Sequence, residues 1–179
     1  KEPISLRETC ILNTIAVKDQ KMSIVTTSKF IKSNFREPEY LTTFSNKYPA
    51  SGRFALVDGI KGSKNFRDGK WQGFEGDNLE VIIDLDTVRE INKISVGFLQ
   101  STNDWIFYPE FVSFGISMDG VHYSKFITIK NEKPWSGNKI EKQNLEAELK
   151  NTKGQYIKVL AKNIGFCPEG HEGEGGKAW

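Results

Sequence analysis

Apolar and polar residues alternate along much of this chain, and alternation with a period of two predicts β-strands. The pattern is clearest at 79–85 and 94–98, where every second residue is apolar. It recurs at 111–117, 123–129 and 157–161, and the turn dipeptide Asp119-Gly120 separates the first two of these segments. Many short strands joined by turns predict an all-β domain built as a sandwich or a jelly roll.

One further segment, 141–149, has the composition of a helix but the spacing of a strand. Glu, Lys, Gln, Leu and Ala dominate it, and these residue types favour helices. Its apolar residues nevertheless fall at positions 145, 147 and 149, which is a period of two. Because the hydrophobic spacing decides which face is buried, we expect a strand here.

The first 32 residues contain short apolar runs on either side of the polar turn 18–21. They predict one or two strands. Two strands alone bury too little surface to be stable, so this segment requires a packing partner. That partner is either the main domain, on which the segment would be an extra hairpin, or a separate domain.

The bulk composition excludes several classes of protein. The 179 residues are enough for one domain with a sizeable core plus a fragment. Lys and Arg total 25 against 23 acids, and the net charge of +2 gives no field for attracting nucleic acid or an anionic membrane. No apolar run approaches the roughly 20 residues of a membrane span, and the first residues lack the blocks of a signal peptide. We expect neither a nucleic-acid partner nor membrane insertion, and any signal would lie upstream.

Four segments, 55–63, 70–74, 79–85 and 112–120, follow one another as an acidic-glycine loop, a tryptophan segment, an alternating strand and a strand ending in Asp-Gly. In this order the chain resembles the discoidin, or coagulation-factor type C, domain and the family 32-like carbohydrate-binding modules. The resemblance covers roughly residues 40–179. Three short segments, 48–52, 71–73 and 103–106, are similar to the C-terminal modules of bacterial family 20 β-N-acetylhexosaminidases, the chitobiases.

The resemblance implies a β-sandwich of galactose-binding-like jelly-roll topology. It implies that residues 1–32 are the terminal strands of a preceding β-sandwich domain and that residues 33–39 are a linker. Residues 40–179 would then form the carbohydrate-binding domain, with its last strand missing from the chain. Cys10 and Cys167 would lie in different units, so we expect two free thiols.

The loop 55–63 contains one acid, two glycines, a hydroxyl and turned backbone carbonyls, which is an oxygen set suited to calcium. By resemblance, the ligands are the carbonyls of Ala55 and Ile60, the carboxylate of Asp58, and the carbonyl and hydroxyl of Ser63. The other interpretation is a glycine-braced turn without an ion. In either case the role of the loop is structural.

Sugars are bound by an aromatic platform with amide, carboxylate or imidazole groups at its rim. The candidate ligand-binding residues lie in loops: Trp71, Asn103, Asp104, Trp105, Tyr108, Asn163 and His171. Trp105 stands in a polar loop and is the best platform. Trp71 precedes a strand, where packing is the stronger interpretation, and Asn163 is equally suited to bracing its own loop.

The resemblance implies a non-catalytic carbohydrate-binding module of a β-N-acetylhexosaminidase-like hydrolase, located in the periplasm or outside the cell. Its ligand would be a glycan that contains N-acetylhexosamine or galactose, and its second partner the upstream catalytic domain. Glycoside hydrolysis needs two placed carboxylates, and the spacing singles out no such pair. Two alternatives stay open, a domain that docks on the catalytic domain without binding sugar and a discoidin-type adhesion module.

Overall fold

The computed structural model describes residues 3–30, 32, 35–133 and 135–179, without the side chain of Lys125. The chain divides into two compact units, Lys1–Asn34 and Phe35–Trp179. The division falls within the expected linker 33–39, of which residues 33 and 34 lie outside the described part. From Phe35 onward the chain packs within the second unit, where the Arg36 guanidinium donates to the Asp86 carboxylate at 2.7 Å.

The first unit is a long, interrupted hairpin. Its outer strands β1 (Cys10–Thr14) and β4 (Thr26–Phe30) are antiparallel, and its inner strands β2 (Val17–Lys18) and β3 (Lys21–Met22) continue the hairpin. The turn residues Asp19 and Gln20 both have positive φ, 48° and 62°. Two successive left-handed residues match the right-handed twist of the strands that they join.

This hairpin has no core of its own, since none of its described residues is buried. Apolar side chains stand open to solvent along it, and Val17, Met22 and Ile24 are 65%, 72% and 87% exposed. The expectation that this segment requires a packing partner agrees with these exposures.

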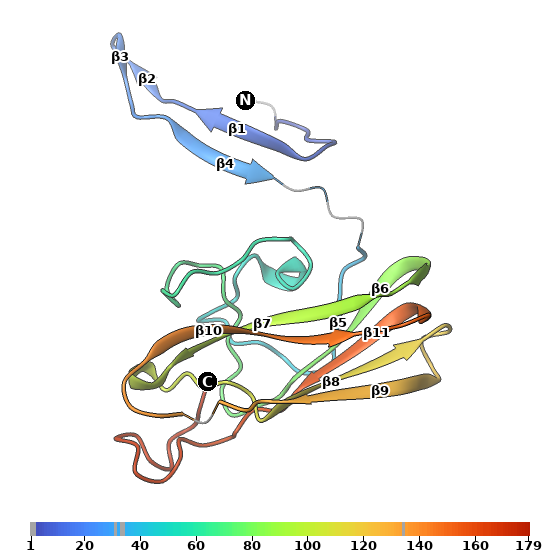
Figure 1. Cartoon of the computed structure of the whole chain (residues 1–179). Helices are drawn as coiled ribbons and strands as arrows, with labels where there is room; N and C mark the ends of the chain where they lie inside the picture. The colour runs from blue at the N-terminus through green and yellow to red at the C-terminus, as the bar shows by residue number, and fades with distance from the viewer. Residues whose placement is uncertain (1–2, 31, 33–34, 134) are drawn as a thin grey trace. The chain divides into compact units, whose positions relative to one another are not determined.

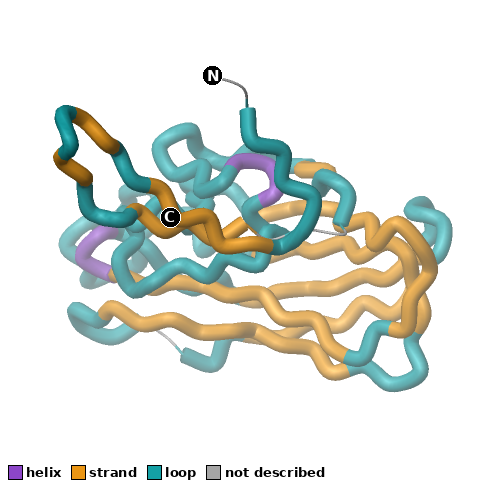
Figure 2. The backbone as a smooth tube through the Cα atoms, turned by 90° about the horizontal axis from the view of Figure 1, so that it is seen from above, coloured by secondary structure: helices purple, strands orange, loops and turns teal. Residues whose placement is uncertain are grey.

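The described residues of the second unit form seven strands and two single-turn 3-10 helices. The strands are β5 (Glu39–Tyr40), β6 (Leu79–Glu90), β7 (Lys93–Ser101), β8 (Phe111–Ser117), β9 (Tyr123–Lys130), β10 (Ile140–Glu148) and β11 (Lys153–Ala161). The 3-10 turns are η1 (Gly52–Phe54) and η2 (Thr102–Asp104). The long segment between β5 and β6 contains η1 and otherwise consists of loops and turns (Figure 2).

The strands form two antiparallel layers (Figure 1). One layer has the order β5-β6-β11-β8-β9, and the other pairs β10 with β7. The chain crosses from β6 to β7, returns for β8 and β9, crosses again for β10 and returns to place β11 between β6 and β8. This alternation between layers confirms the predicted all-β sandwich with a jelly-roll plan.

The core lies between the two layers and consists of every second residue of their strands. Val81, Phe114 and Val159 come from the five-stranded layer and are at most 2% exposed. Leu145 and Ala147 of β10 join the same cluster from the other layer. Sequence alternation thus predicted the buried faces, because each inward residue of a strand is followed by an outward one.

The helix-like composition of 141–149 is overridden by packing, and β10 confirms the predicted strand. Its buried residues are Leu145 and Ala147, and the buried Leu149 directly after the strand continues the same spacing. Ala147 lies opposite Ile94 and Leu145 opposite Val96 on β7. Propensity is a weak influence where one face of a segment is sealed by a neighbouring layer.

The loops at one end of the sandwich are tied together by backbone and side-chain hydrogen bonds. The Glu110 N–H donates to the Lys162 carbonyl at 2.8 Å, and the Phe107 N–H donates to the Trp179 carbonyl at 3.0 Å. The Thr102 hydroxyl donates to the Gly137 carbonyl at 2.8 Å. Segments distant in sequence therefore meet at this end.

No helix among the described residues has the length and apolar content needed to cross a membrane.

Gly154 in β11 offers a test of how tightly the five-stranded layer is packed. A Cβ at this position would stand 2.4 Å from Cγ2 of Ile116 and 3.2 Å from the backbone oxygen of Ser117. We expect Gly154→Ala to lower the free energy of unfolding by about 1–3 kcal/mol, as overpacking does, measured by urea denaturation. Gly97→Ala is the matched control, because its Cβ would meet only the Asn144 side-chain oxygen at 3.3 Å. Equal stability of the two variants would contradict the packing described.

Candidate functional site

Trp105 stands directly after η2, at the end where the loops meet. Its backbone is left-handed, with φ 61° and ψ 25°, a conformation that bulky residues rarely adopt. Its N–H donates to the Thr102 carbonyl at 2.9 Å, and its own carbonyl accepts the Trp179 N–H at 2.8 Å. The backbone is thus held from two sides, while the residue stays 38% exposed.

The indole of Trp105 lies on the backbone of Gly173 and Gly176. A Cβ built on Gly173 would stand 2.4 Å from Cε2 of the indole, and one built on Gly176 would stand 2.6 Å from Cζ3. Cε2 is a ring-fusion atom, so a contact nearest to it lies over the face of the ring and not beyond its edge. Gly173 therefore covers part of one ring face, and Gly176 contacts the six-membered ring at Cζ3.

Asn103 and Asp104 precede the indole within η2. Asn103 is exposed, and Asp104 is half-buried. The Asp104 carboxylate accepts the Ser101 hydroxyl at 2.6 Å, which fixes its position. An amide and a carboxylate thus accompany the aromatic ring in the same short turn, as the sequence predicts.

His171 is buried and uses both ring nitrogens within the protein. Nε2 lies 2.9 Å from the Thr102 carbonyl, and Nδ1 accepts the Gly173 N–H at 3.0 Å. The ring makes edge contacts with Phe107 and Trp135 at centroid distances of 5.2 and 5.5 Å. In this arrangement the imidazole joins the glycine-rich loop, residues 165–176, to Thr102 and presents no free nitrogen to a ligand.

Asn163 and Tyr108 are likewise turned inward. The Asn163 amide donates to the Phe74 carbonyl at 3.1 Å and accepts the Gly165 N–H at 2.7 Å, which braces its own loop. Tyr108 is buried, and its hydroxyl has no hydrogen-bond partner among the described residues. Burial, followed by the nearby Glu141 carboxylate, raises the pKa of Tyr108 to about 12.

Trp71 packs against the loop 55–63. Its indole N–H donates to the Ser63 carbonyl at 2.9 Å. A Cβ on Gly62 would stand 2.2 Å from Cε2 of Trp71, so this indole also covers glycine backbone. These contacts match the packing interpretation of Trp71.

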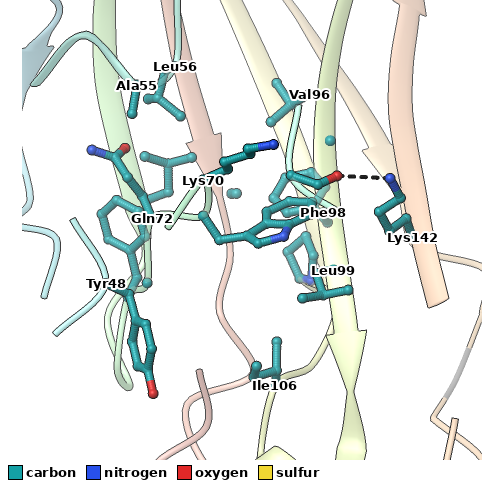
Figure 3. A pocket seen from close by; sticks show the side chains of 18 of the residues that line it. Tyr48, Ala55, Leu56, Lys70, Gln72, Val96, Phe98, Leu99, Ile106 and Lys142 are labelled. Atoms are coloured by element: carbon teal, nitrogen blue, oxygen red, sulfur yellow. Dashed lines mark hydrogen bonds between the residues drawn. The ribbon is translucent and has the colours of Figure 1, made fainter. Parts of the chain in front are cut away.

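A groove of about 700 Å³ opens between the layers beside Trp71 (Figure 3). Its walls include inward-facing side chains of both layers, namely Leu79, Val81, Ile83, Ile94, Val96 and Phe98. β7 pairs with β10 along one edge, and no strand within the described residues pairs with its other edge. The groove continues the apolar core, and polar side chains such as Gln72, Asp77 and Lys142 also line it. Trp71, Asp104 and Asn163 reach its lining, whereas the Trp105 indole faces elsewhere.

The oxygens of the loop 55–63 fit a hard cation in kind. The Asp58 carboxylate accepts the Ile60 N–H at 2.7 Å and the Ser51 hydroxyl, and the Ser63 hydroxyl accepts the Asn65 N–H at 3.0 Å. Each of these oxygens keeps further lone pairs. The predicted set offers five oxygens, and water supplies the remainder in many calcium sites. Among the described side chains, no group of three or more His, Cys, Asp or Glu is placed to hold a metal.

The sequence did not reveal Asp68, which holds the other end of this loop. Its carboxylate accepts the Ser63 N–H at 2.6 Å and the Lys70 N–H at 2.9 Å. Burial alone would raise the pKa of the Asp68 carboxyl, but the hydrogen bonds from Ser63 and Lys70 outweigh it and lower that pKa. An Asp-Gly pair at 68–69 marks a turn, and this was the signal available.

The sequence also did not reveal which residues the Trp105 indole packs against. Gly173 and Gly176 were visible only as part of a glycine-rich run, and Trp135 and Phe107 had no assigned role. This run, residues 165–176, holds five glycines, which predict a loop, and the structure confirms the loop. Which aromatic ring it would meet depends on how the loops gather at this end of the sandwich.

The chain is similar to three solved structures. A chitosan-binding module from a chitosanase/glucanase of Paenibacillus sp. IK-5 has 13% identity, a TM-score of 0.43, and coverage of 70% of this chain and 80% of that one. The C-terminal domain of a chitobiase from Bacteroides fragilis has 19% identity, a TM-score of 0.41, and coverage of 79% and 87%. CBM32-1 from a family 31 glycoside hydrolase of Clostridium perfringens has 16% identity, a TM-score of 0.39, and coverage of 72% of this chain and 84% of that one.

No curated protein matches the chain significantly. The family model of the F5/8 type C domain matches residues 40–172. That range takes in the whole sandwich from Tyr40 through β11, together with the η2 turn and most of the glycine-rich loop. The chain therefore belongs to the F5/8 type C, or discoidin, domain family.

Proposed function

We propose that this chain is a non-catalytic carbohydrate-binding module that holds a glycan on the exposed indole of Trp105. The sugar ring would stack on the open part of the indole, and its hydroxyls would meet Asn103 and Asp104. Binding of this kind combines C–H contact with an aromatic face and polar contacts at the rim.

The exposure of Trp105 is the observation that carries this proposal. A tryptophan that serves only as a core plug is covered on every side, whereas Trp105 rests on glycine and is 38% exposed. Its backbone adopts a left-handed conformation, which costs about 1–3 kcal/mol and persists where surrounding structure imposes it. Such outliers gather at ligand sites.

The finer parts of the proposal concern the parent protein and the glycan. We place the module in a bacterial β-N-acetylhexosaminidase, or chitobiase, that acts in the periplasm or outside the cell. The glycan would contain N-acetylhexosamine or galactose. The chain itself would not hydrolyse it, and the upstream catalytic domain would be its second partner.

The loop 55–63 would hold a structural calcium ion in this proposal. Ala55, Asp58, Ile60 and Ser63 would supply its protein ligands. The oxygen-only donor set supports this assignment. The ion would clamp the loop on which Trp71 packs.

A domain that docks on its catalytic neighbour without binding sugar is the second candidate. The groove between the layers favours it, because Leu56, Ile94 and Phe98 are among the apolar side chains that line it and a docked domain would cover them. The two candidates differ in the part that Trp105 plays.

Replacing the aromatic platform tests the proposal directly. We expect Trp105→Ala to abolish glycan-array binding, because a stacked ring contributes on the order of 1 kcal/mol beyond its buried area and single sites bind weakly. Phe126→Ala removes another exposed aromatic ring, 62% exposed on β9, and should bind as the unaltered chain does. Thermal unfolding of both variants provides the control for folding.

Two outcomes would contradict this assignment of Trp105. Undiminished binding by Trp105→Ala would place the sugar elsewhere. A stability loss of the roughly 3–5 kcal/mol typical of a buried tryptophan, with no glycan bound by the unaltered chain, would make Trp105 part of the scaffold.

The calcium assignment predicts a metal-dependent stability. An ion bound only by the folded state at 100 times its Kd adds about 2.7 kcal/mol, so chelator should lower the melting temperature and excess calcium should restore it. Asp58→Asn should remove this response, and Asp77→Asn, an exposed acid outside the loop, should retain it. Melting curves that coincide with chelator and with calcium would refute the ion.

A further inference from the structure

The glycine-rich loop contains glycines of two kinds. Gly170 and Gly175 have φ of 78° and 77°, and a Cβ on either would meet nothing within 4 Å. Gly173 and Gly176 have φ outside the left-handed region, yet a Cβ on either would collide with the Trp105 indole. The first pair is required by backbone conformation, and the second pair is required by the space that the indole occupies.

His171 connects this loop to the turn that bears Trp105. A backbone N–H only donates, so Nδ1 of His171 must be the acceptor from Gly173. Nε2 therefore carries the proton and donates to the Thr102 carbonyl. The two bonds fix one tautomer of His171 and connect Gly173 with Thr102 of the η2 turn.

The Thr102 carbonyl is the point at which the two sides meet. It accepts the Trp105 N–H at 2.9 Å and the His171 Nε2–H at 2.9 Å. Thr102 is 1% exposed, and its hydroxyl donates to the Gly137 carbonyl at 2.8 Å. The Thr102 carbonyl oxygen thus orients both the backbone of Trp105 and the imidazole of His171.

The plane of the imidazole is itself fixed by aromatic packing. Phe107 and Trp135 meet the ring at interplanar angles of 73° and 80°. These edge contacts prevent rotation of the ring away from its two hydrogen bonds.

We infer that His171 is a positioning residue which, with Gly173 and Gly176, sets the Trp105 indole so that one face is covered by glycine and the other is presented to ligand. This inference rests on the proposed role of Trp105 as the sugar platform. A preset ring loses little conformational freedom on binding, which favours affinity in a weak single site. The glycan would accordingly meet the indole from the side opposite the glycine-rich loop.

Two substitutions of His171 separate its hydrogen bonds from its packing. His171→Phe keeps an aromatic ring and loses both bonds. His171→Gln keeps a donor near the position of Nε2, so the bond to the Thr102 carbonyl can persist. We expect the Phe variant to weaken glycan binding about tenfold or more and the Gln variant to bind within about threefold of the unaltered chain. His122→Gln, an exposed histidine on the β8–β9 turn, is the matched control.

A spectroscopic readout follows the indole without any ligand. The chain has 4 tryptophans, so 5-fluorotryptophan labelling gives four fluorine NMR resonances, and Trp105→Phe assigns one of them. We expect the Trp105 resonance to shift or divide in His171→Phe and in Gly173→Ala, and to move little in His171→Gln. Gly97→Ala controls for the added methyl group and should leave this resonance in place. If His171→Phe fails to fold, the Gln and Gly173→Ala variants still decide.

The outcomes distinguish this inference from the proposed function. An unmoved Trp105 resonance and unchanged affinity in Gly173→Ala and His171→Phe would overturn the positioning role. A moved resonance in a chain that binds no glycan, even unaltered, would refute the sugar site and leave the support of the indole by His171 established.

Discussion

The burial of one apolar face of each layer against the other is the constraint on which the second unit depends. Val81, Phe114 and Val159 on one side and Leu145 and Ala147 on the other leave no freedom of register, because a slip of one residue would turn an entire strand inside out. The chain changes layers between β6 and β7, β7 and β8, β9 and β10, and β10 and β11, so each of these connections must cross an end of the sandwich. The strand order therefore brings together the loops that carry the candidate ligand-binding side chains.

At the end of the sandwich that contains η2, one backbone oxygen connects the Trp105 turn with the glycine-rich loop. The Thr102 carbonyl accepts both the Trp105 N–H and the imidazole of His171. A buried carbonyl that accepts two donors has both lone pairs satisfied, and removing either donor leaves one lone pair without a partner. The left-handed backbone of Trp105 persists because this arrangement and the bond to Trp179 hold it from both directions.

Trp71 and Trp105 show that a tryptophan packed on glycine can serve two different roles. Both indoles lie over glycine, at Gly62 and at Gly173. The Trp71 N–H is bonded to the Ser63 carbonyl, and its ring braces an oxygen-rich loop at the side of the core. Trp105 is fixed chiefly through its backbone, and its side chain is left partly open. An indole with its polar atom satisfied by protein favours a structural role, whereas an exposed face beside Asn103 and Asp104 favours a ligand.

The sequence by itself determined the class of the fold, the strand positions and the loop character of 165–176. Strand alternation is local information, and it outweighed the helical composition of β10 because burial depends on spacing. The sequence also placed Asn103, Asp104 and Trp105 together, since they are neighbours in one turn. Only the tertiary structure decided that His171 and Asn163 face inward and hold their loops. It also decided that Gly173 and Gly176 pack against the indole of Trp105, which lies 68 to 71 positions earlier in the chain. Contacts of this range depend on strand order and loop closure, which no local pattern of side chains encodes.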